Sequence, residues 1–162
     1  MKENATVKSY LLNLTVITIA QVLTLVTFSG FMIFLSTDGQ QIGRNDLRSI
    51  LQTVVPVIVI ACLTSSYFIF KTLTEKIKNS LSLKEKLLKY QQAFIIRSAF
   101  FELAGLSGGV GAFVTGDLYF LAAIVLVIAL FLLLRASPSS IGVDLNLSAN
   151  EKAQLENPDT LL

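Results

Sequence analysis

Glu102 is the only acidic side chain within the apolar stretch that covers residues 93–114. An acidic residue at the centre of a membrane helix costs roughly 3 kcal/mol, so it is expected to face other helices and to have polar partners. A neutral carboxyl bonded to such partners acts as a structural staple. The same group binds and releases a proton or a cation if water reaches it. The residue types leave both roles open.

Polar residues of two other apolar stretches lie at a similar depth. Counting inward from the basic residues that flank each stretch, at 1.5 Å per residue, places four polar side chains level with Glu102. The sequence therefore predicts a proton- or cation-binding cluster in which Glu102 is surrounded by Asn13, Ser65, Ser66 and Tyr67.

Small residues share the helix with Glu102. Ser98, Glu102, Gly105 and Gly109 are spaced by four, three and four residues, so they form one stripe. Gly108, Gly111 and Ala112 widen this surface. Small residues at helical spacing let a second helix approach closely in lipid, which predicts a helix-packing seam. An ion path lined by exposed backbone is the alternative.

Composition shows which solvent surrounds these residues. The chain has 162 residues, of which 53% are hydrophobic and 15% are charged, whereas soluble domains carry about 25% charged residues. Mean hydropathy is +0.68. Four segments are long enough to cross roughly 30 Å of hydrocarbon, namely residues 10–35, 50–70, 93–114 and 118–134. We therefore expect an all-α integral membrane four-helix bundle of two antiparallel hairpins over residues 1–136, followed by a polar tail over 137–162.

Several classes of site are excluded or disfavoured. The chain has one cysteine, Cys62, and no histidine, which excludes an internal disulfide, histidine-containing zinc sites and Ser-His-Asp triads. The sequence GLSGGVG lacks the Lys-Ser/Thr of a P-loop. A net charge of +2 does not suggest nucleic acid. We expect no metal, no cofactor and no enzymatic activity.

Basic residues predict the orientation. They collect between the second and third spans and near both chain ends, and the positive-inside rule then places both termini and residues 71–92 in the cytoplasm of a bacterium. Arg97 is expected to extend to the headgroups. The membrane-surface set is Lys71, Lys76, Lys78, Lys84, Lys86, Lys89 and Arg97. These residues either touch anionic lipid headgroups or form a docking site for a partner.

Capping signals predict where helices begin and end. Ser82 and Glu85 form a capping box that starts a helix near Leu83, and Asn79-Ser80 is the expected turn of a cytoplasmic hairpin over residues 71–92. Gly116 and Asp117 predict a tight turn between the last two spans. Pro56 is expected to bend the second span.

The tail beyond the fourth span has two local signals. The residues SPSS predict a linker, and Ser148 with Glu151 predicts a short surface helix.

A glycine-rich helix with one buried glutamate in a small four-span chain is similar in outline to the proteolipid (c-type) subunits of rotary proton ATPases. The chain also resembles small four-span bacterial membrane proteins. The c-type resemblance implies that Glu102 carries protons, that Gly105, Gly108, Gly109 and Gly111 pack helices closely, and that copies assemble in a ring. In that family the carboxylate and the glycines usually lie on different helices, whereas here they share one.

Two functions follow from these residues. The first is a carrier or channel-like subunit that uses Glu102. The alternative is a non-transporting accessory or scaffold protein whose basic hairpin docks a partner. The expected partners are the lipid bilayer and a further copy or another membrane protein.

Overall fold

The computed structural model describes residues 6–37, 45–78 and 80–161. These residues are almost entirely helical, as the composition predicts, and the one extended pairing among them is an isolated bridge between Thr6 and Leu161. The elements are α1 (Val7–Thr37), α2 (Asn45–Glu75), α3 (Leu83–Thr115), the 3₁₀ turn η1 (Leu118–Phe120), α4 (Leu121–Leu133), α5 (Pro138–Asp144) and α6 (Ala149–Glu156).

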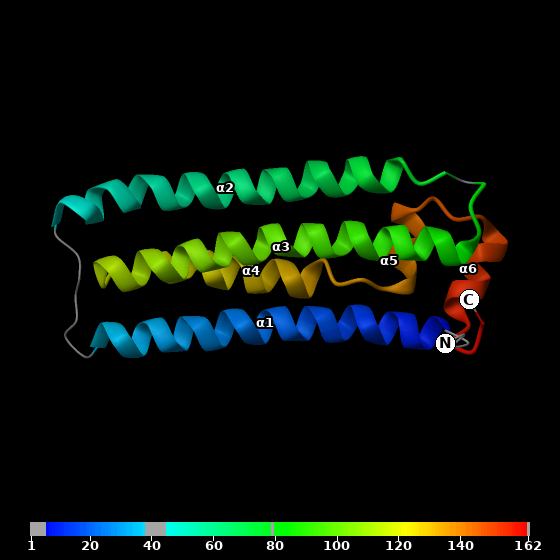
Figure 1. The fold of residues 1–162 in the computed structure, drawn as a ribbon, viewed down its shortest axis with the longest axis horizontal. Helices are drawn as coiled ribbons and strands as arrows, with labels where there is room; N and C mark the ends of the chain where they lie inside the picture. Colours follow the sequence, from blue (N-terminus) through cyan, green and yellow to red (C-terminus); the bar gives the residue numbers. More distant parts are fainter. Residues whose placement is uncertain (1–5, 38–44, 79, 162) are drawn as a thin grey trace.

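The helix α3 is the centre of the bundle and packs against α1, α2 and α4. Figure 1 shows α1 and α2 on opposite sides of α3, so they do not form the packed antiparallel hairpin that the sequence predicts. Instead α1 runs parallel to α3, and both begin at the end of the bundle where Tyr10 donates a hydrogen bond to the carbonyl oxygen of Leu87. The pairs α2–α3 and α3–α4 are antiparallel, as expected.

Three helices among the described residues, α1, α2 and α3, are long and apolar enough to cross a membrane. A fourth crossing exists if the bent pair α4–α5 counts as one span, with an angle of 89° between its two parts. The 13 residues of α4 cover about 20 Å at the helical rise, less than the hydrocarbon thickness. The fourth predicted span is therefore the short member of the bundle.

Glycines bring α1 close to α3. A Cβ atom on Gly105 would lie 2.8 Å from the Leu25 side chain, and one on Gly109 would lie 2.7 Å from the Phe28 ring. Real side chains do not tolerate such distances unless a neighbour moves. Ser98 and Ala112, from the same predicted seam, are buried.

Two other glycines bring η1 and α4 against the next face of α3. A Cβ atom on Gly108 would lie 2.7 Å from the backbone oxygen of Phe120 and 2.8 Å from Cβ of Ala123. One on Gly111 would lie 2.8 Å from the Phe120 ring. Because a backbone oxygen cannot rotate away as a side chain can, Gly108 is the most constrained of the four.

The turn between α3 and η1 has the predicted chemistry. Gly116 is the C-cap in the left-handed region at φ 67°, and the Asp117 side chain accepts a hydrogen bond from the Tyr119 amide. Asp117 also forms an ion pair of 2.9 Å with Arg48 of α2. The Tyr119 amide, followed by Arg48, holds the pKa of Asp117 below its ordinary value.

Other local signals are also present. The Ser82–Glu85 capping box starts α3 at Leu83. Helix α2 ends at Glu75. Asn79, one of the two residues of the expected turn, lies outside the described residues. Pro56 lies within α2, which continues through it without a break.

The Ser148–Glu151 capping box starts the short helix α6, as predicted, but the SPSS segment is not a linker, because it begins helix α5. Ser137 is the N-cap of α5 and Pro138 occupies its first turn, where a missing amide hydrogen costs nothing. Four buried residues of the tail join the hydrophobic core formed with Val7, Leu87 and Phe94, namely Ile141, Leu145, Leu147 and Leu155. The apolar side chains spaced through α5 and α6 explain why this segment folds back onto the bundle.

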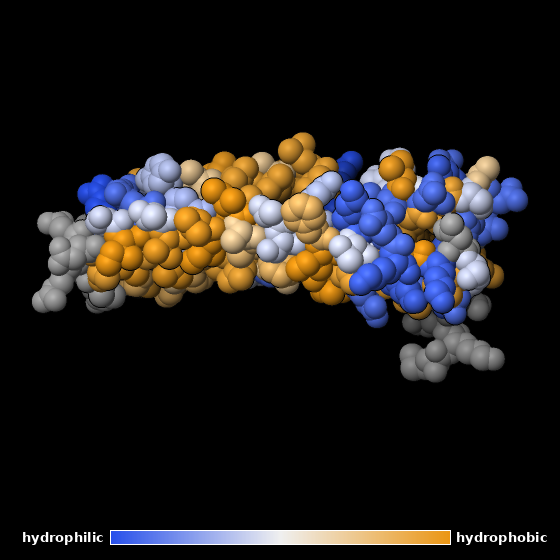
Figure 2. Space-filling model, turned by 90° about the horizontal axis from the view of Figure 1, so that it is seen from above, coloured by the Kyte–Doolittle hydropathy of each residue, from blue (hydrophilic) through white to orange (hydrophobic). Residues whose placement is uncertain are grey.

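The two chain ends meet at the same end of the bundle (Figure 1). The amides of Val7 and Lys8, which have no partner inside α1, donate to the carbonyl oxygens of Thr160 and Pro158 at 3.0 Å each. Figure 2 shows an apolar belt over most of the length and hydrophilic residues gathered at this end. We use the name polar cap for α5, α6 and the chain ends, which all pack on this end of the bundle.

The first prediction concerns the seam between α3 and η1. We expect Gly108→Ala to lower stability by about 1–3 kcal/mol, because the added methyl group meets backbone and forces the helices apart. Gly30→Ala is the matched control, since nothing lies within 4 Å of a Cβ there. Thermal unfolding in detergent measures both. Equal melting temperatures for the two variants would show that the close contact does not hold α4 in place.

Candidate functional site

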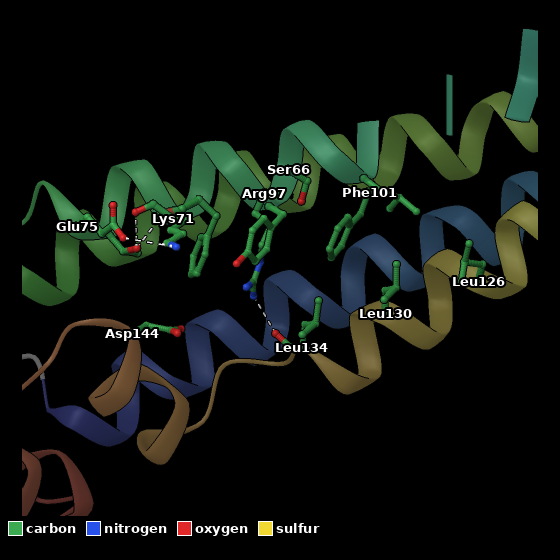
Figure 3. A pocket seen from close by; sticks show the side chains of 13 residues that line it. Ser66, Lys71, Glu75, Arg97, Phe101, Leu126, Leu130, Leu134 and Asp144 are labelled. Carbon is green, nitrogen blue, oxygen red and sulfur yellow. Dashed lines mark hydrogen bonds and ion pairs between the residues drawn. The ribbon is translucent and has the colours of Figure 1, made fainter. Parts of the chain in front are cut away.

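The principal cavity of the described part of the chain is a groove on the side of the bundle. It has a volume of about 710 Å³ and lies between α2 and α4, with α3 as its floor and α5 at one end. Figure 3 shows its side chains arranged along the helix axes. A volume of this size is in the range of small-molecule sites. We call it the lateral groove.

The lining of the lateral groove changes from apolar to charged along its length. One end is formed by Leu63, Phe101, Leu126 and Leu130. The other end has the cation Lys71 and the two acids Glu75 and Asp144. Figure 3 shows Arg97 between these two ends, with Glu75 and Asp144 beyond it. An elongated ligand in this groove would need an apolar part and a charged part.

Arg97 lies at the centre of the groove, where it makes contacts within the bundle that the sequence did not predict. Its guanidinium carbon lies 4.0 Å from the ring centroid of Phe70 and 5.2 Å from that of Phe94. One guanidinium nitrogen donates to the carbonyl oxygen of Leu134 at 2.8 Å. That oxygen belongs to the last turn of α4, where a helix leaves carbonyls without partners. Arg97 therefore caps α4 and is held in the groove by two rings.

Ser66 is the polar side chain nearest the apolar end. It is 1% exposed, and its hydroxyl has no hydrogen-bond partner among the described residues. Figure 3 shows it on α2 beside Arg97 and Phe101. A buried polar atom without a partner is costly, so a ligand atom that bonds to it would be favoured.

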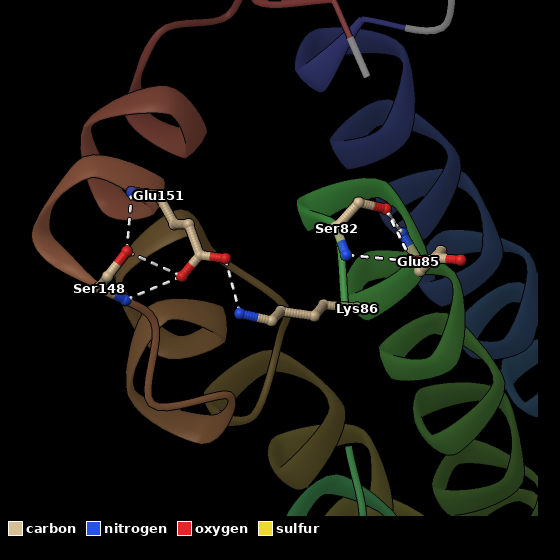
Figure 4. Close-up of polar contacts among 5 residues, drawn as sticks. All are labelled: Ser82, Glu85, Lys86, Ser148 and Glu151. Atoms are coloured by element: carbon tan, nitrogen blue, oxygen red, sulfur yellow. Dashed lines mark hydrogen bonds and ion pairs between the residues drawn. The ribbon is translucent and has the colours of Figure 1, made fainter. Parts of the chain in front are cut away.

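Side-chain contacts hold the polar cap over the charged end. Tyr90 of α3 donates to Asp144 of α5 at 3.1 Å. Lys86 of α3 bonds to Glu151 of α6 at 2.6 Å, and Glu151 also closes the capping box with Ser148 (Figure 4). Lys86 was expected at the membrane surface, but its side chain is 4% exposed. The hydrogen bond from Lys86, followed by those of Ser148, holds the pKa of Glu151 below its ordinary value.

The other predicted membrane-surface lysines are exposed. Lys71 lies 3.9 Å from Glu75 one turn further along α2, and both side chains are more than half exposed. The remaining members are Lys76, Lys78, Lys84 and Lys89, all exposed. The charged end of the groove and these lysines therefore share one end of the bundle.

The predicted cluster around Glu102 does not form. Glu102 is half-buried and, within the described ranges, has no hydrogen bond or ion pair. Ser66 and Tyr67 instead line the lateral groove with Arg97. Arg97 lies about 140° around α3 from Glu102. Ser66 and Tyr67 therefore lie on a different side of α3 from Glu102.

The remaining predicted partners are also apart from Glu102. Tyr67 is 60% exposed, with its ring edge against Phe68. Ser65 is half-buried and Asn13 is exposed. Asn13 precedes Gln21 on α1 by eight residues, or about 12 Å toward the amino end. Neither is a partner of the carboxyl.

Gln21 of α1 is a buried polar residue that the predicted cluster around Glu102 does not include. Because α1 and α3 run parallel and Leu25 contacts Gly105, one turn back along each helix places Gln21 and Glu102 at the same level. The side-chain oxygen of Gln21 is buried without a partner among the described residues. An amide in an apolar span was the only sequence signal for it.

Asp144 and Glu75 were also missed as groove residues. Asp144 lies in a segment whose sequence suggests a polar tail, and the sequence suggests that Glu75, next to Lys76, faces solvent.

No group of three or more metal-ligating side chains occurs in the residues that the structure describes. Comparisons with protein families, with characterised proteins and with solved structures gave no match to this chain.

The second prediction concerns the polar cap. We expect Glu151→Gln to destabilise the docking of α5 and α6 by about 3 kcal/mol, because it leaves the buried ammonium of Lys86 without a counter-charge. Limited proteolysis of the carboxyl-terminal segment and the melting temperature measure the loss. Glu156→Gln, an exposed acid of α6, is the control.

The double variant Lys86→Met with Glu151→Leu should recover most of this stability, since apolar residues can replace a buried pair.

Lowering the pH should destabilise the polar cap, as Glu151→Gln does. The lowered pKa of folded Glu151 stabilises the cap above the ordinary glutamate pKa, and this contribution disappears as the pH falls through the lowered value. A cap equally resistant to protease in all variants would contradict the role of this pair.

Proposed function

We propose that this protein is a multi-pass protein of the bacterial cytoplasmic membrane that binds a phospholipid in the lateral groove. The observation that carries the proposal is the order of its lining. Along the groove the lining consists first of aliphatic side chains, then of Ser66, then of Arg97 and finally of the charged end. This order matches the acyl chain, the ester region and the headgroup of a lipid.

The apolar end suits an acyl chain. Leu63 of α2, Phe101 of α3 and two leucines of α4, Leu126 and Leu130, line this end. The groove opens on the side of the bundle, within reach of the surrounding bilayer, so a lipid enters it without crossing a polar barrier. Ser66 is placed to donate to an ester carbonyl oxygen, which would relieve the cost of its buried hydroxyl.

The charged end suits a headgroup. The guanidinium of Arg97 uses one donor for the Leu134 carbonyl, and its planar fork has five donors in total, a geometry that binds phosphate oxygens well. This end of the groove lies on the same end of the bundle as the exposed lysines and both chain ends. The positive-inside rule assigns that end to the cytoplasm, so the lipid would come from the inner leaflet.

Lipid binding places the protein in the non-transporting class of the two functions that the sequence suggests. A bundle that holds a lipid at one site can stabilise or present it to a neighbouring membrane protein. The exposed lysines beside the groove, such as Lys76 and Lys89, then contact anionic headgroups or the partner.

The third prediction tests the groove itself. Leu130→Trp adds a large side chain to the apolar end, so we expect the purified protein to lose the lipid that wild type retains. Leu133→Trp is the matched control on the same helix, since Leu133 is 78% exposed and lies outside the groove. Native mass spectrometry of protein released from nanodiscs counts retained lipids.

Equal lipid retention by the two tryptophan variants would overturn the proposal, provided that both melt like wild type. Capture of a helix from a second copy or another protein in the groove, detected by cross-linking from position 130, would overturn it as well.

A second candidate function, proton binding at Glu102, is favoured by Gln21. The buried oxygen of Gln21 has no donor, and Glu102 lies at the same level of the α1–α3 contact. A protonated carboxyl is a donor that could satisfy this oxygen, whereas a carboxylate is an acceptor only.

The fourth prediction tests this pair. If Glu102 carries protons, liposomes containing wild type should show proton flux above empty vesicles, and Glu102→Gln should abolish it while retaining the melting temperature. Glu156→Gln controls for the removal of an acid elsewhere. Wild-type flux no greater than that of empty vesicles excludes the carrier function and leaves Glu102 a structural role.

A further inference from the structure

We infer that the lateral groove selects a zwitterionic phospholipid whose phosphate carries a primary ammonium group, as in an ethanolamine headgroup. This inference rests on the lipid binding proposed above and adds the identity of the headgroup. It follows from where the cations and the acids lie along the groove.

The charges of the groove are ordered along α2. Ser66 is followed by Phe70 about 6 Å further along, and Glu75 lies about 7.5 Å beyond Phe70 at the helical rise. Arg97 lies against the Phe70 ring at 4.0 Å, so its positive charge is level with Phe70. Lys71 follows Phe70 directly and lies 3.9 Å from Glu75. The order of groups from the apolar end outward is therefore the Ser66 hydroxyl, the Arg97 cation, and then Lys71 with the acids Glu75 and Asp144.

A phospholipid has its groups in the complementary order. The ester carbonyl is nearest to the acyl chains, the phosphate follows, and the ammonium of a zwitterionic headgroup is outermost. With the ester at Ser66, the phosphate meets Arg97 and the ammonium reaches Glu75 and Asp144. Phosphate and guanidinium form strong charge-assisted hydrogen bonds, often in pairs.

The two acids distinguish among headgroups. Asp144 accepts one hydrogen bond from Tyr90 at 3.1 Å through a single oxygen, which leaves its other oxygen as an acceptor. Glu75 lies 3.9 Å from Lys71, and its side chain is 66% exposed. The positive charges of Lys71 and Arg97 equal the negative charges of Glu75 and Asp144, so these four groove residues have no net charge. A headgroup with only negative charge would meet acids at its outer end.

The choice between a primary and a quaternary ammonium follows from hydrogen bonding. A primary ammonium has three N–H donors for carboxylate oxygens, whereas a choline group has none. Choline is recognised by aromatic cages, and here the ring of Phe70 is already covered by Arg97. The groove therefore favours ethanolamine over choline and over glycerol headgroups.

The fifth prediction tests this selectivity. Wild type is assembled in nanodiscs made from equal parts of phosphatidylethanolamine, phosphatidylcholine and phosphatidylglycerol, and lipids retained on release are identified by native mass spectrometry. We expect phosphatidylethanolamine to be enriched roughly tenfold over the other two, the factor expected for one charge-assisted hydrogen bond.

Variants assign the enrichment to the acids. Glu75→Gln combined with Asp144→Asn should bring the enrichment of phosphatidylethanolamine close to one, because neutral amides remove the negative charge that attracts the ammonium, while Tyr90 keeps an oxygen acceptor at position 144. Arg97→Gln should lower retention of all three lipids. Glu156→Gln, outside the groove, should behave like wild type.

The outcomes separate the two proposals. Retention of lipid without headgroup preference, or with preference for phosphatidylglycerol, overturns the inference on the headgroup while lipid binding stands. A preference that survives the double variant also overturns it. No retained lipid in wild type, or retention unaffected by Leu130→Trp, overturns lipid binding itself.

Discussion

A carbonyl oxygen without a hydrogen-bond donor is costly in hydrocarbon, and this constraint governs the end of α4. Helix α4 stops after 13 residues, and the carbonyl oxygen of Leu134 accepts a hydrogen bond from Arg97. Because α4 ends there, the chain can bend by 89° into α5. Beyond this point the groove-facing side of α2 no longer has α4 opposite it. The lateral groove, the position of Asp144 and the docking of the polar cap all follow from this short helix.

The arrangement around α3 has a different physical basis. In lipid there is no hydrophobic drive between helices, so close contact and hydrogen bonds decide which helices meet. Gly105 and Gly109 admit Leu25 and Phe28 of α1, and Gly108 admits the backbone at Phe120. One helix with small residues on two adjacent faces can take two neighbours closely, which makes α3 the centre. The half-buried glutamate on the same helix lies one turn from the Leu25–Gly105 contact, at the level of Gln21.

Several charged side chains at the polar end make contacts inside the molecule. Lys86 is buried against Glu151, Arg97 caps α4, and Asp144 accepts from Tyr90. Sequence composition alone makes these residues look like surface charges, because a basic loop and a polar tail are typical of solvated segments. The apolar residues of the tail, from Ile141 to Leu155, bury this surface by closing over the bundle end.

The sequence by itself determined the solvent, the helical class and most helix ends. Apolar length, the Ser82–Glu85 capping box and the Gly116–Asp117 turn are local signals, and local signals need no knowledge of distant contacts. Only the tertiary structure decided the relative depth of the helices and which sides face each other, because the position and rotation of a helix depend on all its neighbours at once. For that reason Ser66 lies in the groove with Arg97, while Gln21, and not Asn13, is the α1 residue level with Glu102.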